Sequence, residues 1–138
     1  MVRNRWGAWR RAGVIALLGL SAGLSTFLVQ AEGPVPTLKQ TIGLTDLPSQ
    51  GQGMMRLIYQ GGPFRYDKDG TVFGNRERIL PARQRGYYRE YTVMTPGERS
   101  RGARRIVCGG QKPAMPDACF YTNDHYASFR QIVRSAER

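Results

Sequence analysis

Clusters of apolar residues after residue 62 predict β-strands. The runs are TVF (71–73), YYREYTVM (87–94), RRIVCG (104–109), CFYTN (119–123) and ASFRQIV (127–133). They are rich in aromatic and β-branched residues, and turn sequences such as DKDG and TPGERSRG separate them. Because no helical crossover lies between these runs, we expect an antiparallel sheet.

One helix is predicted before the strands, within DLPSQGQGMMRLIYQGG (46–62). Met54, Leu57 and Ile58 form an apolar stripe at helical spacing, and Gly61-Gly62 marks the end. An N-terminal helix packed on one face of a mainly antiparallel sheet belongs to the α+β class. The chain length fits a single domain over 46–138, preceded by an irregular N-terminal arm over 32–45.

Strand periodicity sorts the charged side chains onto faces. Tyr88, Glu90 and Thr92 share one face of their strand, and Arg105 and Val107 share one face of the next. A carboxylate and a guanidinium can therefore oppose each other on neighbouring strands.

The first 31 residues have the pattern of a secretory signal peptide. Four arginines and no acid precede the apolar run 14–29, and VQA ends the segment. The run is 16 residues long, whereas a bilayer span needs about 20. We expect cleavage after Ala31, secretion, and no stable membrane association afterwards; the alternative is a retained anchor.

The charge points to an anionic partner. The formal net charge is +11, from 21 Lys and Arg against 10 Asp and Glu, and loss of the four leader arginines lowers it to +7. Such a surface favours nucleic acid or an anionic membrane, although a merely soluble basic protein is also compatible.

The cysteine and histidine content favours a disulfide over a metal site. In an exported chain, Cys108 and Cys119 are expected to pair across a Gly- and Pro-containing loop. Two cysteines and one histidine are too few for the usual four metal ligands, so no metal is expected.

Taken alone, the charged residues allow ordinary structural explanations. His125, the only histidine, stands in TNDHYASFR and is either incidental or catalytic. Glu90 fits a surface strand acid paired with an arginine, and Glu77 can simply pair with Arg76 or Arg78.

Three motifs, in order and spacing, closely resemble one family. They are GGPFRYDKDGTVFGNRERILP (61–81), GYYREYTVMTPGERSRGARRI (86–106) and DHYASF (124–129). Together they resemble the secreted guanyl-specific ribonucleases of bacteria, the barnase-type microbial ribonucleases. The resemblance covers residues 47–133 and implies the microbial ribonuclease fold.

The resemblance implies a role for each matching residue. Glu90 would be the general base, His125 the general acid, and Arg101 and Arg105 the phosphate-binding cations. Tyr126 would lie at the phosphate or base site. The guanine-binding loop would consist of Phe73, Gly74, Asn75, Arg76 and Glu77.

The implied reaction is the cleavage of single-stranded RNA 3′ of guanosine, without cofactor or metal. The base takes the proton of the 2′-hydroxyl and the acid protonates the departing 5′-oxygen, which gives a 2′,3′-cyclic phosphate and then a 3′-phosphate. A carboxylate can accept both N1–H and the 2-amino group of guanine, which adenine cannot offer. Arg78 could compete for Glu77, and Gly74 stands where relatives often have a polar side chain.

Two other functions remain open at this stage. One is a non-catalytic, basic, exported RNA-binding protein of the same fold, and the other is an antibacterial toxin ribonuclease. A monomer is expected. An acidic, barstar-like cytosolic inhibitor is a possible protein partner because the predicted site is cationic.

Overall fold

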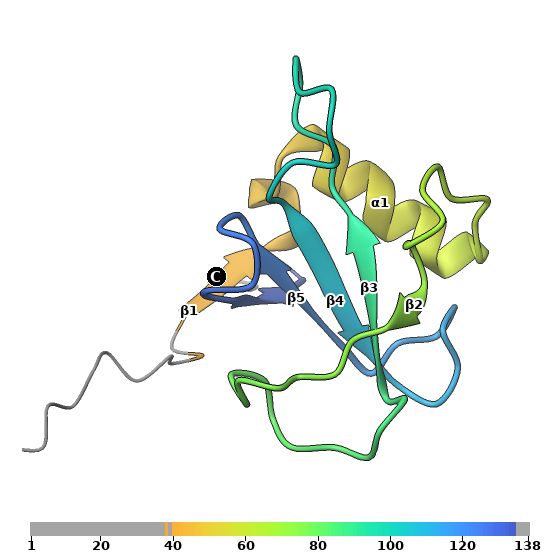
Figure 1. Cartoon of the computed structure of the whole chain (residues 1–138), viewed down its shortest axis with the longest axis vertical. Helices are drawn as coiled ribbons and strands as arrows, with labels where there is room; N and C mark the ends of the chain where they lie inside the picture. The colour runs from red at the N-terminus through yellow and green to blue at the C-terminus, as the bar shows by residue number, and fades with distance from the viewer. Residues whose placement is uncertain (1–37, 39, 135–138) are drawn as a thin grey trace, which may run out of the picture. The chain divides into compact units, whose positions relative to one another are not determined.

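A six-stranded sheet and one α-helix make up the described part of the chain, which comprises residue 38 and residues 40–134 of a computed structural model (Figure 1). The elements are β1 (Gln40–Gly43), a 3-10 turn η1 (Leu44–Asp46), α1 (Ser49–Gln60), β2 (Thr71–Val72), β3 (Tyr88–Thr92), β4 (Arg105–Gly109), β5 (Ala118–Thr122) and β6 (Arg130–Val133). The α+β class and the single helix predicted from sequence are confirmed.

The sheet is mainly antiparallel, as predicted. Its strand order is β1-β6-β5-β4-β3-β2, and every neighbouring pair from β2 to β6 is antiparallel. The exception is β1, which pairs with β6 in parallel, so that Gln40 lies opposite Arg130. The prediction of an irregular arm over 32–45 is therefore wrong at residues 40–43. The remote strand β6 supplies the partner that stabilises this segment, and local sequence carries no sign of it.

Helix α1 begins later than Asp46, which lies in the preceding 3-10 turn. The helix ends at Gly61, whose left-handed φ of 79° lets its N–H bond to the carbonyl of Ile58. Met54 and Ile58 are buried as predicted. Met55 completes the buried side, while Leu57 is only partly buried.

The two faces of the sheet have different roles. Tyr91, Val93 and Ile106 join Met54 and Ile58 in the core beneath α1. The opposite face carries a second apolar cluster that includes Tyr88, Val107 and Phe120. Because strand side chains alternate, this second face also carries Glu90.

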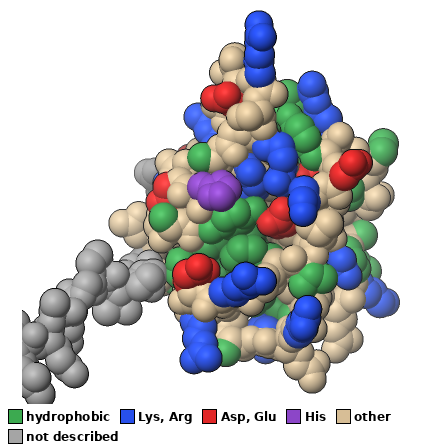
Figure 2. Space-filling model, viewed as in Figure 1, with side chains coloured by type: hydrophobic (Ala, Val, Ile, Leu, Met, Phe, Trp, Pro, Cys, Tyr) green, Lys and Arg blue, Asp and Glu red, His purple; other side chains and the backbone are tan. Residues whose placement is uncertain are grey.

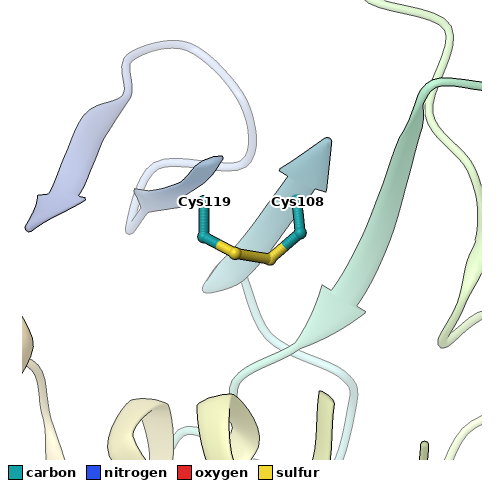
Figure 3. Close-up of a disulfide and its surroundings, with 2 residues drawn as sticks. All are labelled: Cys108 and Cys119. Carbon is teal, nitrogen blue, oxygen red and sulfur yellow. A yellow bond between two sulfur atoms is a disulfide. The ribbon is translucent and has the colours of Figure 1, made fainter. Parts of the chain in front are cut away.

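The disulfide predicted between Cys108 and Cys119 is present (Figure 3). The two residues are register partners on the central strands β4 and β5, with Cα atoms 4.1 Å apart. Both are at most 5% exposed and lie in the core beneath α1. The bond therefore joins the two middle strands on the face away from Glu90.

The predicted leader over 1–31 and the rest of the arm before Gln40, apart from Leu38, lie outside the described residues. Within the described range, no helix is long and apolar enough to cross a lipid bilayer.

Removal of the disulfide should destabilise the protein. The bond closes a loop with a sequence separation of 11 residues. A double variant, Cys108→Ala with Cys119→Ala, should lose about 3 kcal/mol of unfolding free energy, because its unfolded chain is less constrained. Urea denaturation measures the loss.

Dithiothreitol provides the control. It should move the midpoint of the wild-type protein toward that of the double variant and leave the variant unchanged. If the oxidised wild-type protein and the double variant had equal urea midpoints, the disulfide would not stabilise the fold.

Candidate active site

The carboxylate of Glu90 stands at the middle of β3, on the sheet face opposite α1. Its register partners are Thr71 on β2 and Val107 on β4. Arg101 Nη2 lies 3.3 Å from Oε1, and the hydroxyl of Tyr126 donates to Oε2 at 2.6 Å. The side chain of Glu90 is 15% exposed. Both carboxylate oxygens therefore have partners that fix their direction while the group still reaches solvent.

Arg101 belongs to the loop that joins β3 to β4. Its Nε donates to Thr92 Oγ1 at 3.0 Å, and its guanidinium carbon lies 6.0 Å from the ring centroid of Tyr66. Strand alternation predicted that a guanidinium could oppose the carboxylate from a neighbouring strand. The cation that pairs with Glu90 comes instead from this loop, because Arg105 on β4 uses its guanidinium elsewhere.

Arg105 is a buried cation with an unused donor. It is 3% exposed, and its Nη1 donates to the carbonyls of Gly102 at 2.9 Å and Arg104 at 2.8 Å. Its Nε has no partner, alone among the buried side-chain N and O atoms of the described residues. Leaving a charged donor buried and unpaired is costly, and an anionic oxygen would satisfy it. The guanidinium carbon of Arg105 lies 5.8 Å from the ring centroid of Tyr126, the residue whose hydroxyl binds Glu90.

The loop after β5 presents His125. The backbone N–H of His125 donates to the Ala103 carbonyl at 3.0 Å, which ties this loop to the β3–β4 loop. His125 and Tyr126 have φ values of 54° and 70°, in the left-handed region that non-glycine residues rarely adopt. Their rings are 5.0 Å apart. His125 and Glu90 therefore meet at Tyr126, on one side of the molecule.

Figure 2 shows the surroundings of the histidine, coloured purple and the only one in the chain. It borders a patch of hydrophobic side chains and a group of cationic ones. This face thus combines apolar surface, positive charge and an exposed imidazole.

Asp124 holds the turn that presents the histidine. Its carboxylate accepts hydrogen bonds from the N–H and hydroxyl of Ser128, at 2.9 and 2.5 Å, and from the hydroxyl of Thr122 at 2.7 Å. Burial acts to raise the pKa of Asp124, but these hydrogen bonds outweigh it and leave the pKa below its usual value.

Tyr126 is a permanent proton donor to Glu90. Burial raises the pKa of Tyr126 to about 12, helped by the hydrogen bond to Glu90 and its charge and opposed by Arg105. The phenol therefore keeps its proton throughout the neutral range.

An aromatic surface adjoins the carboxylate. Phe73 stacks on Tyr126 with ring centroids 5.1 Å apart and an interplanar angle of 25°, and Phe129 meets Phe73 edge-on at 6.0 Å. The N–H of Phe73 bonds to the Tyr88 carbonyl at 2.9 Å, so this ring sits beside the start of β3. Flat aromatic surface of this kind suits a nucleobase.

Asn75 shapes the loop that follows Phe73. Its side-chain amide binds the carbonyl and the N–H of Leu80, at 2.9 and 3.1 Å, and its φ is 48°. Asparagine tolerates this left-handed conformation better than most residues. The side chain of Asn75 is therefore used within the loop.

Gly74, Arg76 and Glu77 are exposed on the same loop. In the part of the chain that the structure describes, no ion pair joins Glu77 to Arg76 or Arg78. The alternative in which an adjacent arginine takes this carboxylate is not what the structure has. Among the described residues, no hydrogen bond or ion pair joins Gly74, Arg76 or Glu77 to Glu90 or His125.

Sequence reasoning missed the residues that position the site. Thr92 orients Arg101, while Thr122 and Ser128 hold the histidine turn through Asp124. Thr92 was detectable, because strand alternation already placed it on the face of Glu90. The Thr122–Asp124–Ser128 contacts depend on the conformation of the turn and left no comparable signal.

The described residues include no cluster of three or more His, Cys, Asp or Glu side chains able to hold a metal ion. What they bring together is a carboxylate, an imidazole and two guanidiniums. Such a set can move protons at an anionic centre such as a phosphate.

Replacing Asp124 should give a pH-dependent loss of stability. Because its folded pKa is lowered, the ionised form stabilises the fold above the ordinary aspartate value of 3.8, and this contribution disappears as the pH falls through the folded pKa. Asp124→Asn should therefore lower Tm by a few degrees at pH 7 and by progressively less below pH 3.8. Thermal unfolding followed by circular dichroism measures the difference.

Asp67→Asn is the matched control, since Asp67 is exposed and makes no hydrogen bond or ion pair in the described structure. If the Tm difference between wild type and Asp124→Asn stayed the same as the pH fell below 3.8, the ionised carboxylate of Asp124 would not be what stabilises the turn.

Comparison with known proteins shows the family of the chain. A family model described as ribonuclease matches residues 31–133. Guanyl-specific ribonuclease Sa of Kitasatospora aureofaciens is 49% identical over 92 residues, which cover 67% of this chain and 92% of that protein. Guanyl-specific ribonuclease St of Saccharopolyspora erythraea is 50% identical over 94 residues, covering 68% and 88%.

A further relative and a solved structure extend the likeness. Guanyl-specific ribonuclease Sa3 of Kitasatospora aureofaciens is 56% identical over 86 residues, which are 62% of this chain but only 58% of that protein. The crystal structure of ribonuclease Sa2 with guanosine-2′-cyclophosphate has a TM-score of 0.63 at 44% identity and covers 70% of this chain and 99% of that one.

The residues matched by the family model include all three motifs, and the solved relative shares the fold. This chain therefore belongs to the family of guanyl-specific microbial ribonucleases.

Proposed function

We propose that this chain is an exported endoribonuclease that cleaves single-stranded RNA on the 3′ side of guanosine. The observation that carries the proposal is the meeting of Glu90 and His125 at Tyr126, beside the unpartnered Nε of Arg105. Family membership and the guanyl-specific relatives support it.

The roles follow from the chemistry of RNA. Glu90 accepts the proton of the 2′-hydroxyl, and the oxygen attacks the adjacent phosphorus. His125 protonates the departing 5′-oxygen, which leaves a 2′,3′-cyclic phosphate on guanosine. In the slower second stage the roles reverse: His125 takes a proton from water, and Glu90 returns one to the 2′-oxygen.

The guanidiniums stabilise the charge that develops on the phosphate. Arg105 offers its free Nε from a buried position, where a charge–charge interaction is stronger than in water. Arg101 holds the carboxylate in place and remains 26% exposed, so it can contact the same phosphate. Tyr126 donates to Glu90 and fixes the direction of the oxygen that faces the substrate.

Guanine preference rests on the loop after β2. The unpaired carboxylate of Glu77 can accept both N1–H and the 2-amino group of guanine, whereas adenine presents an acceptor at N1. The clamp between Asn75 and Leu80 holds the loop backbone, and Phe73 provides the face for the base. Gly74 has no side chain to interfere.

Export is supported by the leader-like segment over 1–31 and by the disulfide, a bond typical of oxidising compartments. If the enzyme folds before export, the producing cell is exposed to it. An acidic cytosolic inhibitor that covers Arg101, Arg105 and His125 would fit the charge of the site.

Cleavage of GpU in EDTA tests the proposal and should release a cyclic guanosine phosphate, with ApU cut far more slowly. Glu90→Gln and His125→Ala should each lower kcat by about 10²- to 10⁴-fold, since each removes one proton-transfer group. Chromatographic product analysis measures both. Salt-sensitive RNA binding without cleavage would instead support the non-catalytic alternative.

Glu77→Ala should relax base discrimination. Loss of the paired hydrogen bonds to guanine should lower kcat/KM for GpU by about 100-fold and leave ApU almost unchanged. Asp67→Ala, which removes an exposed carboxylate outside the guanine-binding loop, serves as the comparison and should retain the GpU-to-ApU ratio. An unchanged ratio in Glu77→Ala would show that guanine is read elsewhere.

A further inference from the structure

An open hollow of about 1120 Å³ lies between the segment 83–87, which leads into β3, and the loop 110–117, which joins β4 to β5. The green and blue connections that form its two walls lie at the same end of the sheet (Figure 1). Arg83, Arg85 and Lys112 give the hollow its positive charge. None of the residues that line it belongs to the catalytic set or to the guanine loop over 73–77, so the reaction derived above leaves this hollow without a role.

The cations of the hollow are not neutralised by carboxylates. Arg83, Arg85 and Lys112 are exposed, and none of them forms an ion pair in the described range 40–134. The one lining acid, Asp117, accepts a hydrogen bond from the hydroxyl of Tyr87 at 3.0 Å. Three positive charges thus face a single carboxylate that is already hydrogen-bonded, and such a cluster of guanidinium and ammonium groups attracts phosphate.

Backbone hydrogen bonds hold the two walls of the hollow together where β3 begins and β4 ends. The N–H of Gly110 donates to the Tyr87 carbonyl at 3.2 Å, and the N–H of Asp117 donates to the Gly109 carbonyl at 2.7 Å. Arg83 lies over the ring of Tyr87, with 5.1 Å between the guanidinium carbon and the ring centroid. Both wall backbones and Arg83 are therefore in place before an anion binds, which lowers the ordering cost of binding.

The hollow follows the guanine loop along the same connection between β2 and β3. The clamp between Asn75 and Leu80 closes the guanine loop. The hydroxyl of Tyr88 then binds the carbonyl of Pro81 at 2.6 Å, and the lining of the hollow starts at Arg83. The hollow therefore adjoins the base-binding side of the site.

The position of the hollow relative to β3 indicates which part of an RNA strand reaches it. His125, the proposed donor to the leaving 5′-oxygen, is tied to Ala103 in the loop that follows β3. The strand downstream of the scissile phosphate leaves with that oxygen, whereas the hollow lies at the other end, where β3 begins. The RNA that can reach the hollow is therefore the part on the 5′ side of the guanosine.

We propose that this hollow binds phosphate groups of the RNA strand on the 5′ side of the guanosine, through Arg83, Arg85 and Lys112. The inference rests on the proposed ribonuclease function and adds to it a contact outside the cleft of Glu90 and His125. An acidic protein surface has the same charge, but the adjoining guanine loop favours RNA as the occupant. The enzyme should then prefer a guanosine within a strand to one at the 5′ end.

Substrates that differ only in their 5′ extension test the inference. From GpU to UpUpUpGpU, kcat/KM should rise about tenfold, because each has one guanosine and only the longer one brings phosphates to the hollow. A double variant, Arg83→Ala with Lys112→Ala, removes one cation from each wall. It should lose most of this rise and cleave GpU at the wild-type rate. Chromatographic analysis of the products measures both rates.

Salt dependence gives a second measurement. Each phosphate contact with a single strand adds about 0.7 to the slope of log affinity against log salt concentration. For UpUpUpGpU, the slope of kcat/KM should therefore fall by about 0.7 in Lys112→Ala and further in the double variant. Arg56→Ala removes one exposed cation from α1 and is the matched control for Lys112→Ala. It should keep both the wild-type slope and the preference for the longer substrate.

Several outcomes would overturn the inference. One is a wild-type protein that cleaves GpU and UpUpUpGpU equally well, and another is a double variant that loses the same factor on both substrates. A third is a double variant that keeps the preference for UpUpUpGpU but no longer binds a glutamate-rich peptide that the wild type binds, which would assign the hollow to an acidic protein. Absence of any cleavage of GpU by the wild-type protein would instead refute the ribonuclease function.

Discussion

The double hydrogen bonding of one carboxylate organises this molecule's functional face. Glu90 receives Arg101 on one oxygen and Tyr126 on the other, so a single group joins β3, the β3–β4 loop and the loop after β5. Tyr126 also carries the contacts to His125 and Phe73. The imidazole of His125, the carboxylate of Glu90 and the aromatic surface are therefore positioned by one set of contacts. The partners of the carboxylate are polar and partly solvated, which lets it act on substrate as well as stabilise the loops.

The sheet separates stability from chemistry by its two faces. The face beneath α1 holds the main apolar core and the disulfide, while the opposite face carries Glu90, Arg105 and the second apolar cluster. Adjacent residues of a strand point to opposite faces. On β4, Cys108 therefore forms the disulfide on the face beneath α1, while the next residue, Val107, packs on the face of Glu90. Burial of Arg105 with an unpaired Nε is a local cost that the rest of the fold must offset. Such a cost is understandable where an anion is to be bound.

The loop after β2 and the loop after β5 both contain non-glycine residues with a left-handed backbone conformation. His125 and Tyr126 after β5, and Asn75 and Arg78 after β2, all have positive φ values without being glycine. Each such residue costs on the order of 1–3 kcal/mol, and it persists only where surrounding contacts hold it. Those contacts are the Asp124 hydrogen bonds in one loop and the Asn75–Leu80 clamp in the other. In both loops the backbone is fixed before substrate arrives, which reduces the ordering required on binding.

Local sequence determined the helix, the central strands, the face of Glu90 and the cysteine pairing, because these depend on periodicity and short-range closure. The resemblance carried by the motifs also predicted Glu90, Arg101, Arg105 and His125 as a set. Only the tertiary structure decided that residues 40–43 pair with β6 and that the ion-pair partner of Glu90 is Arg101. It also decided that the side chain of Asn75 binds the backbone of Leu80. Those choices depend on which distant segments meet, and on competition among several arginines and amides for the same oxygens. A one-dimensional pattern does not contain that information.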